Sequence, residues 1–176
     1  MFDSWYEFKY VHAIKSWDGI PLKTHRYSFK TTKNLRFLVD VEEYNFKVFI
    51  VKFYLRSHLY SSKRFNLLTN DFDTSRKLRT CLQIMLSIYK KEPFASFGFI
   101  GTPIIDEERK INEAENNTKK YRIYSVLVKS LFSDVHFIHA YNQEKSAYTL
   151  INKDNPEPEL FTKVQTMFAH YYPSLG

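Results

Sequence analysis

Cysteine and long apolar runs are scarce in this sequence of 176 residues. Because Cys81 is the single cysteine, an internal disulfide is excluded, and a reducing compartment is favoured. No stretch approaches the roughly 18 consecutive apolar residues that a membrane-spanning helix needs. The first ten residues also lack the basic segment and following apolar run of a secretory leader. The sequence therefore predicts a soluble, cytoplasmic protein without a membrane partner.

Glycine is also scarce, whereas aromatic residues and positive charge are in excess. Phe, Tyr and Trp make up 18% of the chain and glycine occurs four times, which predicts a core rich in rings and few flexible loops. Hydrophobic residues at 44% and charged residues at 26% are ordinary for a globular protein. The net charge of +7 favours a polyanionic partner, because Lys and Arg release counterions when they neutralise phosphates. We expect one domain over residues 1–176.

The N-terminal part has the pattern of several strands. Residues 5–12 and 24–30 are rich in aromatic residues, and residues 35–41 alternate apolar side chains on one face, as a half-buried strand does. Residues 46–55 form an apolar run that only Lys47 and Lys52 interrupt. This run predicts a central strand, with a turn at residues 43–45 before it.

Three helices are predicted from apolar spacing and from end signals. The first extends from an N-cap at Asp73 to about Lys91, ahead of Pro93. The second follows an N-cap at Thr118, or Asn117 before it, and has a stripe of Tyr121, Tyr124, Leu127, Val128 and Leu131. The closing helix covers residues 159–171 and has its own apolar stripe.

The remaining segments complete the predicted order of elements. A short buried strand is expected at residues 94–100, a solvated loop or short helix at 106–115, and a hairpin at 135–141 and 145–152. The order is then antiparallel strands, helix, strand, helix, hairpin and closing helix. This order predicts an α+β fold in which helices pack on an antiparallel or mixed sheet.

The start of the second helix is a candidate anion site. Cations are mildly unfavourable in the first turn of a helix, because the helix dipole leaves partial positive charge there. An external phosphate or carboxylate would offset this, held by free N–H groups and nearby side chains. The alternative is that Glu113 and Glu115 supply the negative charge from within the chain. The predicted anion-binding residues are Asn117, Thr118, Lys119, Lys120 and Arg122.

A basic and aromatic segment in the N-terminal part is a candidate nucleic-acid interface. Single-stranded nucleic acids are bound by rings that stack on bases and by cations that pair with phosphates. Lysines that alternate along a strand also protect a sheet edge from aggregation, which is the alternative here. The residues predicted to contact nucleic acid are Lys23, Arg26, Tyr27, Lys30, Lys33 and Arg36.

His136 and His139 have the spacing of a metal-binding pair but are expected on a strand. Residues three apart on a strand point to opposite faces, so the two imidazoles cannot chelate one ion without a bulge. His139 is instead expected to pair with Tyr148 or Ser146 on the neighbouring strand. The sequence assigns no metal, no cofactor and no catalytic residue.

Three blocks in the C-terminal half resemble a group of small uncharacterised bacterial proteins. These blocks are ASFGFIG at residues 95–101, NTKKYRIY at 117–124 and SAYTLIN at 146–152. We know of no established activity for this group, so the resemblance implies no function.

The order of the elements is similar to that of the GNAT acyltransferase superfamily. In that superfamily the helix after a central strand receives the pyrophosphate of coenzyme A through a Gln/Arg-x-x-Gly-x-Gly/Ala loop. The corresponding connection here, residues 69–74 (TNDFDT), contains no glycine and has two acids. A tyrosine on the later helix is the general acid in many such enzymes, and the resemblance implies Tyr124 for that role. Its place in the apolar stripe favours burial.

Three functions follow from these observations. The favoured one is a basic, non-enzymatic binding domain for an anionic partner, with nucleic acid as one candidate. The second is a GNAT-like acyltransferase with an altered coenzyme A loop. The third is a protein-interaction subunit of a bacterial toxin-antitoxin or phage-defence pair, which would use exposed aromatic residues such as Trp5, Trp17 and Tyr172.

Overall fold

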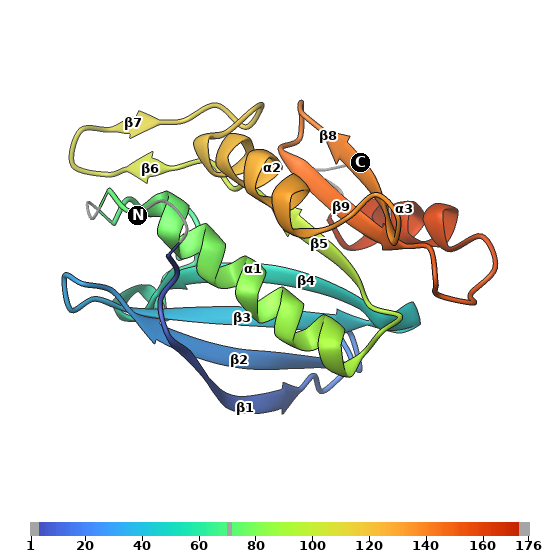
Figure 1. Ribbon diagram of the computed structural model, residues 1–176. Coiled ribbons are helices and arrows are strands. Elements are labelled where there is room, and N and C mark those ends of the chain that lie inside the picture. Colours follow the sequence, from blue (N-terminus) through green and yellow to red (C-terminus); the bar gives the residue numbers. More distant parts are fainter. Residues whose placement is uncertain (1–3, 70–71, 173–176) are drawn as a thin grey trace.

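The computed structural model describes residues 4–69 and 72–172, and over these residues the chain is α+β. Seven strands form one mixed sheet, and three α-helices pack on it (Figure 1). The sheet contains β1 (Phe8–Lys15), β2 (Lys23–Lys30), β3 (Arg36–Tyr44), β4 (Val48–Leu55), β5 (Ser96–Ile100), β8 (Phe137–Asn142) and β9 (Ala147–Asn152). The helices are α1 (Thr74–Lys91), α2 (Lys119–Leu131) and α3 (Leu160–Tyr171). The predicted α+β class with a mixed sheet is thus confirmed.

The strand order in the sheet is β1-β2-β3-β4-β5-β9-β8. The first four strands form an antiparallel meander, and β5 then joins β4 in parallel. Because parallel neighbours need a crossover connection, α1 lies between these two strands in the chain. β9 is antiparallel to both β5 and β8 and so completes the sheet beside its parallel pair.

Helices cover both faces of the sheet. α1 and α2 lie side by side in front of it, and α3 lies behind it (Figure 1). Successive residues of a strand point to opposite faces, so Phe49 and Val51 on β4 pack in the core under α1 and α2. Val48 and Ile50 belong to a second apolar cluster with Val164 of α3. Within the described ranges, none of the helices combines the length and the apolarity that crossing a bilayer would take.

The starts of α1 and α2 lie where the sequence predicts them, but the two caps differ. Asp73 precedes α1, and its carboxylate accepts a hydrogen bond from the hydroxyl of Tyr6 instead of capping the helix. Thr118 is a true cap, because its Oγ1 accepts from the backbone N–H of Tyr121 at 3.2 Å. The same hydroxyl donates to the carbonyl of Gly101 at 2.6 Å. A Cβ at Gly101 would lie 2.7 Å from the nitrogen of Tyr121, so the helix starts directly against this glycine.

The acidic segment after β5 forms a small hairpin, where the sequence suggested a loop or a short helix. β6 (Ile105–Asp106) and β7 (Ile111–Asn112) pair antiparallel, apart from the main sheet. Asp106 accepts from the backbone N–H of Arg109 at 3.1 Å within the turn. Ile105 also exchanges backbone hydrogen bonds with the segment at residues 66–68. These long-range bonds, which local sequence does not encode, hold the segment extended.

Candidate functional site: the cleft between β4 and β5

A cleft opens where the two parallel strands separate. β4 and β5 pair only over residues 48–51 and 96–99. Beyond these residues β4 stays beside β3 as far as Leu55, whereas β5 stays beside β9. The two strands therefore diverge (Figure 1) and leave a cavity of about 210 Å³ between them.

The lining of this cleft is mostly apolar. Its residues come from β4, from β5 and the loop after it, from the connection before α1, from α2 and from the residue that follows α3. They are Val51, Lys52, Phe53, Phe65, Phe99, Ile100, Thr102, Lys120 and Tyr172. The fold thus gathers four polar side chains, on segments far apart in sequence, around an aromatic cavity.

Lys120 is the buried cation of the cleft, and its residue is 9% exposed. Its Nζ donates to the backbone carbonyl of Phe65 at 2.6 Å and to Thr102 Oγ1 at 3.0 Å. The hydroxyl of Thr102 donates to the same carbonyl at 2.8 Å. Burial and, to a smaller extent, the charge of Lys77 together lower the pKa of Lys120 to about 8, whereas Glu113 opposes the change. Lys120 therefore reaches the balance between ammonium and neutral amine near pH 8.

A second polar group on the cleft wall is centred on Glu42 of β3. Its Oε2 accepts from the hydroxyls of Tyr172 at 2.6 Å and Tyr44 at 2.8 Å, and its Oε1 accepts from Lys52 at 2.9 Å. The ammonium of Lys52 also lies 4.9 Å from the ring centre of Tyr172. Burial, followed by the charge of Glu42, raises the pKa of Tyr172 well above its ordinary value. This network fastens the end of α3 to β3 and β4.

A smaller cavity of about 90 Å³ adjoins the cleft and shares Phe53, Phe65 and Lys120 with it. It lies at the first turn of α1, where Thr74 and Lys77 line it. Among the described residues of its lining there is no Asp or Glu. Its cationic side chains are Arg64, Lys77, Lys119 and Lys120. A positive cavity at a helix start is suited to an anion, because backbone N–H groups and the helix dipole act together there.

The predicted anion-binding residues divide into three groups. Lys119 and Lys120 line the small cavity. Asn117 and Arg122 lie outside that lining, where the guanidinium donates to the backbone carbonyl of Asn117. Thr118 is buried as the cap of α2.

An internal carboxylate lies at the start of α2, as the alternative from the sequence suggested. Glu113 accepts from the backbone N–H of Lys119 at 2.6 Å through Oε1, and from that of Ile104 at 2.9 Å through Oε2. The backbone donor of Lys119 is thereby satisfied within the chain, while its side chain remains on the small cavity.

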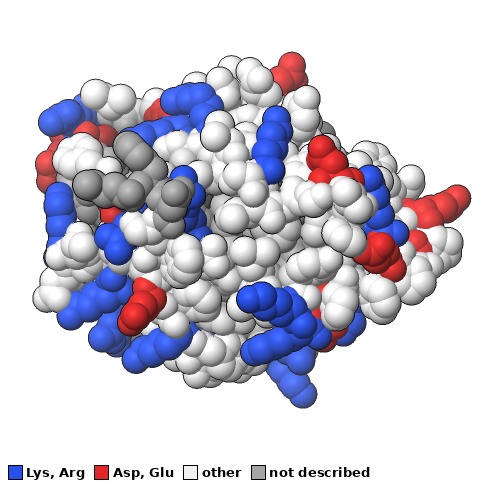
Figure 2. Space-filling model, in the orientation of Figure 1, with Lys and Arg blue, Asp and Glu red and all other residues white. Residues whose placement is uncertain are grey.

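The residues predicted to contact nucleic acid are also divided. Arg26 forms two hydrogen bonds to Asp40, at 2.8 and 3.0 Å, and Tyr27 is buried in the core. Lys23 is the first residue of β2, at the end of the strand away from Lys30. In contrast, Lys30 on β2 lies opposite Arg36 on β3, and Lys33 lies in the turn between these strands. On the face in Figure 2 the basic side chains lie in several separate groups, most of them on its left and lower parts.

The two histidines and Tyr124 have structural partners. His136 contacts Asp154 at 2.8 Å, and His139 Nδ1 lies 2.8 Å from the hydroxyl of Tyr148, which confirms that predicted pairing. Tyr124 is fully buried, stacks on Phe99 at 4.1 Å between ring centres, and donates to the sulfur of Met85. Burial raises the pKa of Tyr124 well above its ordinary value. Its ring belongs to the core between the sheet and the helices α1 and α2.

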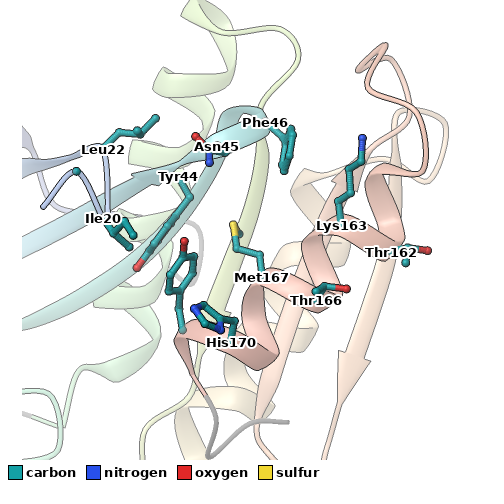
Figure 3. Close-up of a pocket in the computed structure, with 12 residues that line it drawn as sticks. Ile20, Leu22, Tyr44, Asn45, Phe46, Thr162, Lys163, Thr166, Met167 and His170 are labelled. Carbon is teal, nitrogen blue, oxygen red and sulfur yellow. The ribbon is translucent and has the colours of Figure 1, made fainter.

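A wider groove of about 370 Å³ lies between α3 and the turns at the ends of β1 and β3 (Figure 3). Ile20 and Leu22 line one side, and Met167 and His170 of α3 line the other. Trp17, one of the aromatic residues proposed for a protein contact, is 97% exposed in the nearby β1–β2 turn.

Of the other aromatic residues proposed for a protein contact, Trp5 is half exposed, with 47% of its surface accessible. Tyr172 is held in the cleft network by its hydrogen bond to Glu42.

The sequence did not single out Glu42, Phe65 or Thr102 as site residues. One signal was present, since Lys52 interrupts the apolar run of β4. A lysine in an apolar strand indicates a polar partner nearby. The sequence could not identify this partner, because Glu42 lies on the neighbouring strand β3.

Comparison of this chain with known protein families, with curated proteins and with solved structures found no match. Its function is therefore argued from the geometry of the cleft and of the cavity beside it.

Proposed function

We propose that the cleft between β4 and β5 binds an acyl-coenzyme A, and that the protein is a GNAT-like acyltransferase with an altered donor loop. The order of the elements supports this architecture: a meander, α1, the parallel strand β5, α2, the β8–β9 hairpin and α3. The GNAT resemblance implies that the helix after the central strand receives the pyrophosphate, and α1 has this position.

The observation that carries the proposal is the pairing of two unlike cavities. The mostly apolar cleft suits the thioester arm of the ligand, and the adjoining cationic cavity suits its phosphates. The connection before α1 has no glycine. Phosphates would then be bound by the side chains of Arg64, Lys77 and Lys119 and by the first turn of α1, in place of a glycine-rich loop.

Two double variants, each a control for the other, test the proposal by thermal shift. Acetyl-coenzyme A at about ten times its Kd should stabilise the wild type by about 1.4 kcal/mol, which is a rise of about 3 to about 6 °C for a chain of this length. Arg64→Gln with Lys119→Gln should lose this rise, because two phosphate partners are removed. Lys30→Gln with Arg36→Gln removes the same charge elsewhere and should keep it. The absence of any shift at millimolar acetyl-coenzyme A would refute the proposal.

The β2–β3 turn supports a second candidate function, the binding of single-stranded nucleic acid. Lys30, Lys33 and Arg36 gather there, and the Phe72 ring, which is 83% exposed, lies 5.7 Å from the ammonium of Lys33. Cations beside an exposed ring suit phosphates and a stacked base. Retention on single-stranded DNA should fall with salt. Lys30→Gln with Arg36→Gln should weaken it, whereas Arg64→Gln with Lys119→Gln should not. No retention by the wild type at low salt would exclude this function.

A further inference from the structure

We propose that Lys120 is itself an acylation site: its ε-amine accepts the acyl group of a thioester bound in the cleft. For the identity of the donor, this inference rests on the proposed function. It assigns to Lys120 a covalent role, in addition to the electrostatic role of a cation near phosphates.

The hydrogen bonds of Lys120 leave the lone pair of its neutral nitrogen free to react. A neutral amine has two N–H donors and one lone pair. The carbonyl of Phe65 and the hydroxyl of Thr102 provide two acceptors, at 2.6 and 3.0 Å. Because Lys120 lines the cleft, the lone pair is available to a carbonyl carbon bound there.

The surroundings of Lys120 favour the neutral, nucleophilic form. Little water reaches this residue, which is 9% exposed, so its ammonium is poorly solvated. Lys77 on α1 acts in the same direction by charge repulsion, while Glu113 and Cys81 act against it. Burial thereby lowers the pKa of Lys120 to about 8, so about half of its amine is neutral near pH 8. An exposed lysine, with a pKa of about 10.4, is less than about 1% neutral at that pH.

The reaction balances without any further reagent. The Nζ lone pair attacks the thioester carbonyl, a C–N bond forms and the C–S bond breaks. The sulfur leaves as a thiolate and takes up the proton that the amine loses. The product is an amide, which keeps one N–H for the carbonyl of Phe65, while Thr102 continues to donate to that carbonyl. The acyl group then occupies the apolar cleft, and the modified protein has lost its buried charge.

The test uses two donors, acetyl-coenzyme A and the small thioester S-acetyl-N-acetylcysteamine, which carries no phosphate. Intact mass spectrometry and peptide mapping after a short incubation near pH 8 should locate one acetyl group at Lys120. Lys120 should react about 100-fold faster than exposed lysines, from the difference in neutral fraction. The rate at Lys120 should level off above about pH 9, whereas exposed lysines gain about tenfold per pH unit up to about pH 10.

Lys120→Arg, which retains the charge but not the nucleophile, should lose this modification, and Lys129→Arg, at an exposed position of α2 outside both cavities, should keep it. If the Lys120→Arg protein does not fold, the peptide map and pH profile of the wild type still decide. Acetyl-coenzyme A that shifts the melting temperature while Lys120 reacts no faster than exposed lysines would overturn the inference and leave the proposed function intact. Rapid acetylation of Lys120 by the small thioester, without binding of acetyl-coenzyme A, would support the inference and overturn the proposed function.

Discussion

Replacing Lys120 by methionine should remove a pH dependence from the stability of the protein. Methionine retains the unbranched stem but cannot take up a proton. In the unfolded chain a lysine has a pKa near 10.5, whereas burial lowers that of Lys120 to about 8 in the folded protein. Between these values the unfolded chain holds a proton that the folded protein has released, so stability rises with pH. The unfavourable contribution is complete below about pH 8 and disappears by about pH 10.5.

The size of the effect follows from the pKa difference. One pKa unit corresponds to about 1.4 kcal/mol, so the wild type should gain about 2 kcal/mol over the Lys120→Met variant between about pH 7.5 and about pH 9.5. Burial raises the pKa of Tyr44 and Tyr172, which lowers stability as the pH passes about 10. That contribution is common to both proteins and cancels in their difference.

Urea unfolding followed by circular dichroism would measure both stabilities across this pH range. The exposed neighbour provides a matched control, because Lys119→Met removes the same group from an accessible position and should change stability equally at each pH. A difference between wild type and Lys120→Met that stays constant within about 0.5 kcal/mol would refute the reasoning. It would mean that Lys120 remains well solvated as an ammonium.

Two further substitutions test the packing around the site and the sheet. Gly101→Ala should destabilise the protein by about 1 to about 3 kcal/mol in urea unfolding, because its Cβ would lie 2.6 Å from Thr118 Oγ1 and 2.7 Å from the nitrogen of Tyr121. An unchanged unfolding midpoint would contradict this close contact. Asp40→Ala should cost about 2 to about 4 kcal/mol because it leaves the partly buried Arg26 unpaired. Arg26→Met should recover part of this loss in a double-mutant cycle, whereas additive effects would show that the pair is not coupled.

The helices and several strands could be predicted from local patterns in the sequence. The stripes at Leu78 and Tyr124 are buried as expected, and Thr118 begins α2 by capping it. The pairing of His139 with Tyr148 followed from the alternation of faces in a hairpin. Each of these depends on residues fewer than ten positions apart along the chain, where sequence spacing and spatial proximity agree.

Other features depended on contacts between distant segments. The segment at residues 106–115 is polar, and its pairing as β6 and β7 depends on backbone bonds to residues 66–68. Residues 23–36 alternate cations with aromatic residues in the sequence, which suggested one shared surface. Arg26 is instead paired with Asp40 of β3, and no spacing rule predicts this ion pair. The sequence also did not predict that β4 and β5 pair over only four residues each. Where these two strands separate depends on β3 and β9, with which they pair on their other sides.

By itself the sequence determined the α+β class, the positions of the three helices and a set of cations near residue 120. These follow from periodicity, capping and composition, which are local. Only the tertiary structure decided what those cations do. Lys120 lines both the cleft and the cavity at the first turn of α1, whereas Lys119 lines only that cavity. Glu113 bonds the backbone at the start of α2, and the proposed anion site is the small cavity lined by α1, α2 and β4. Burial among rings, which depends on the whole fold, gives Lys120 its lowered pKa and its proposed chemistry.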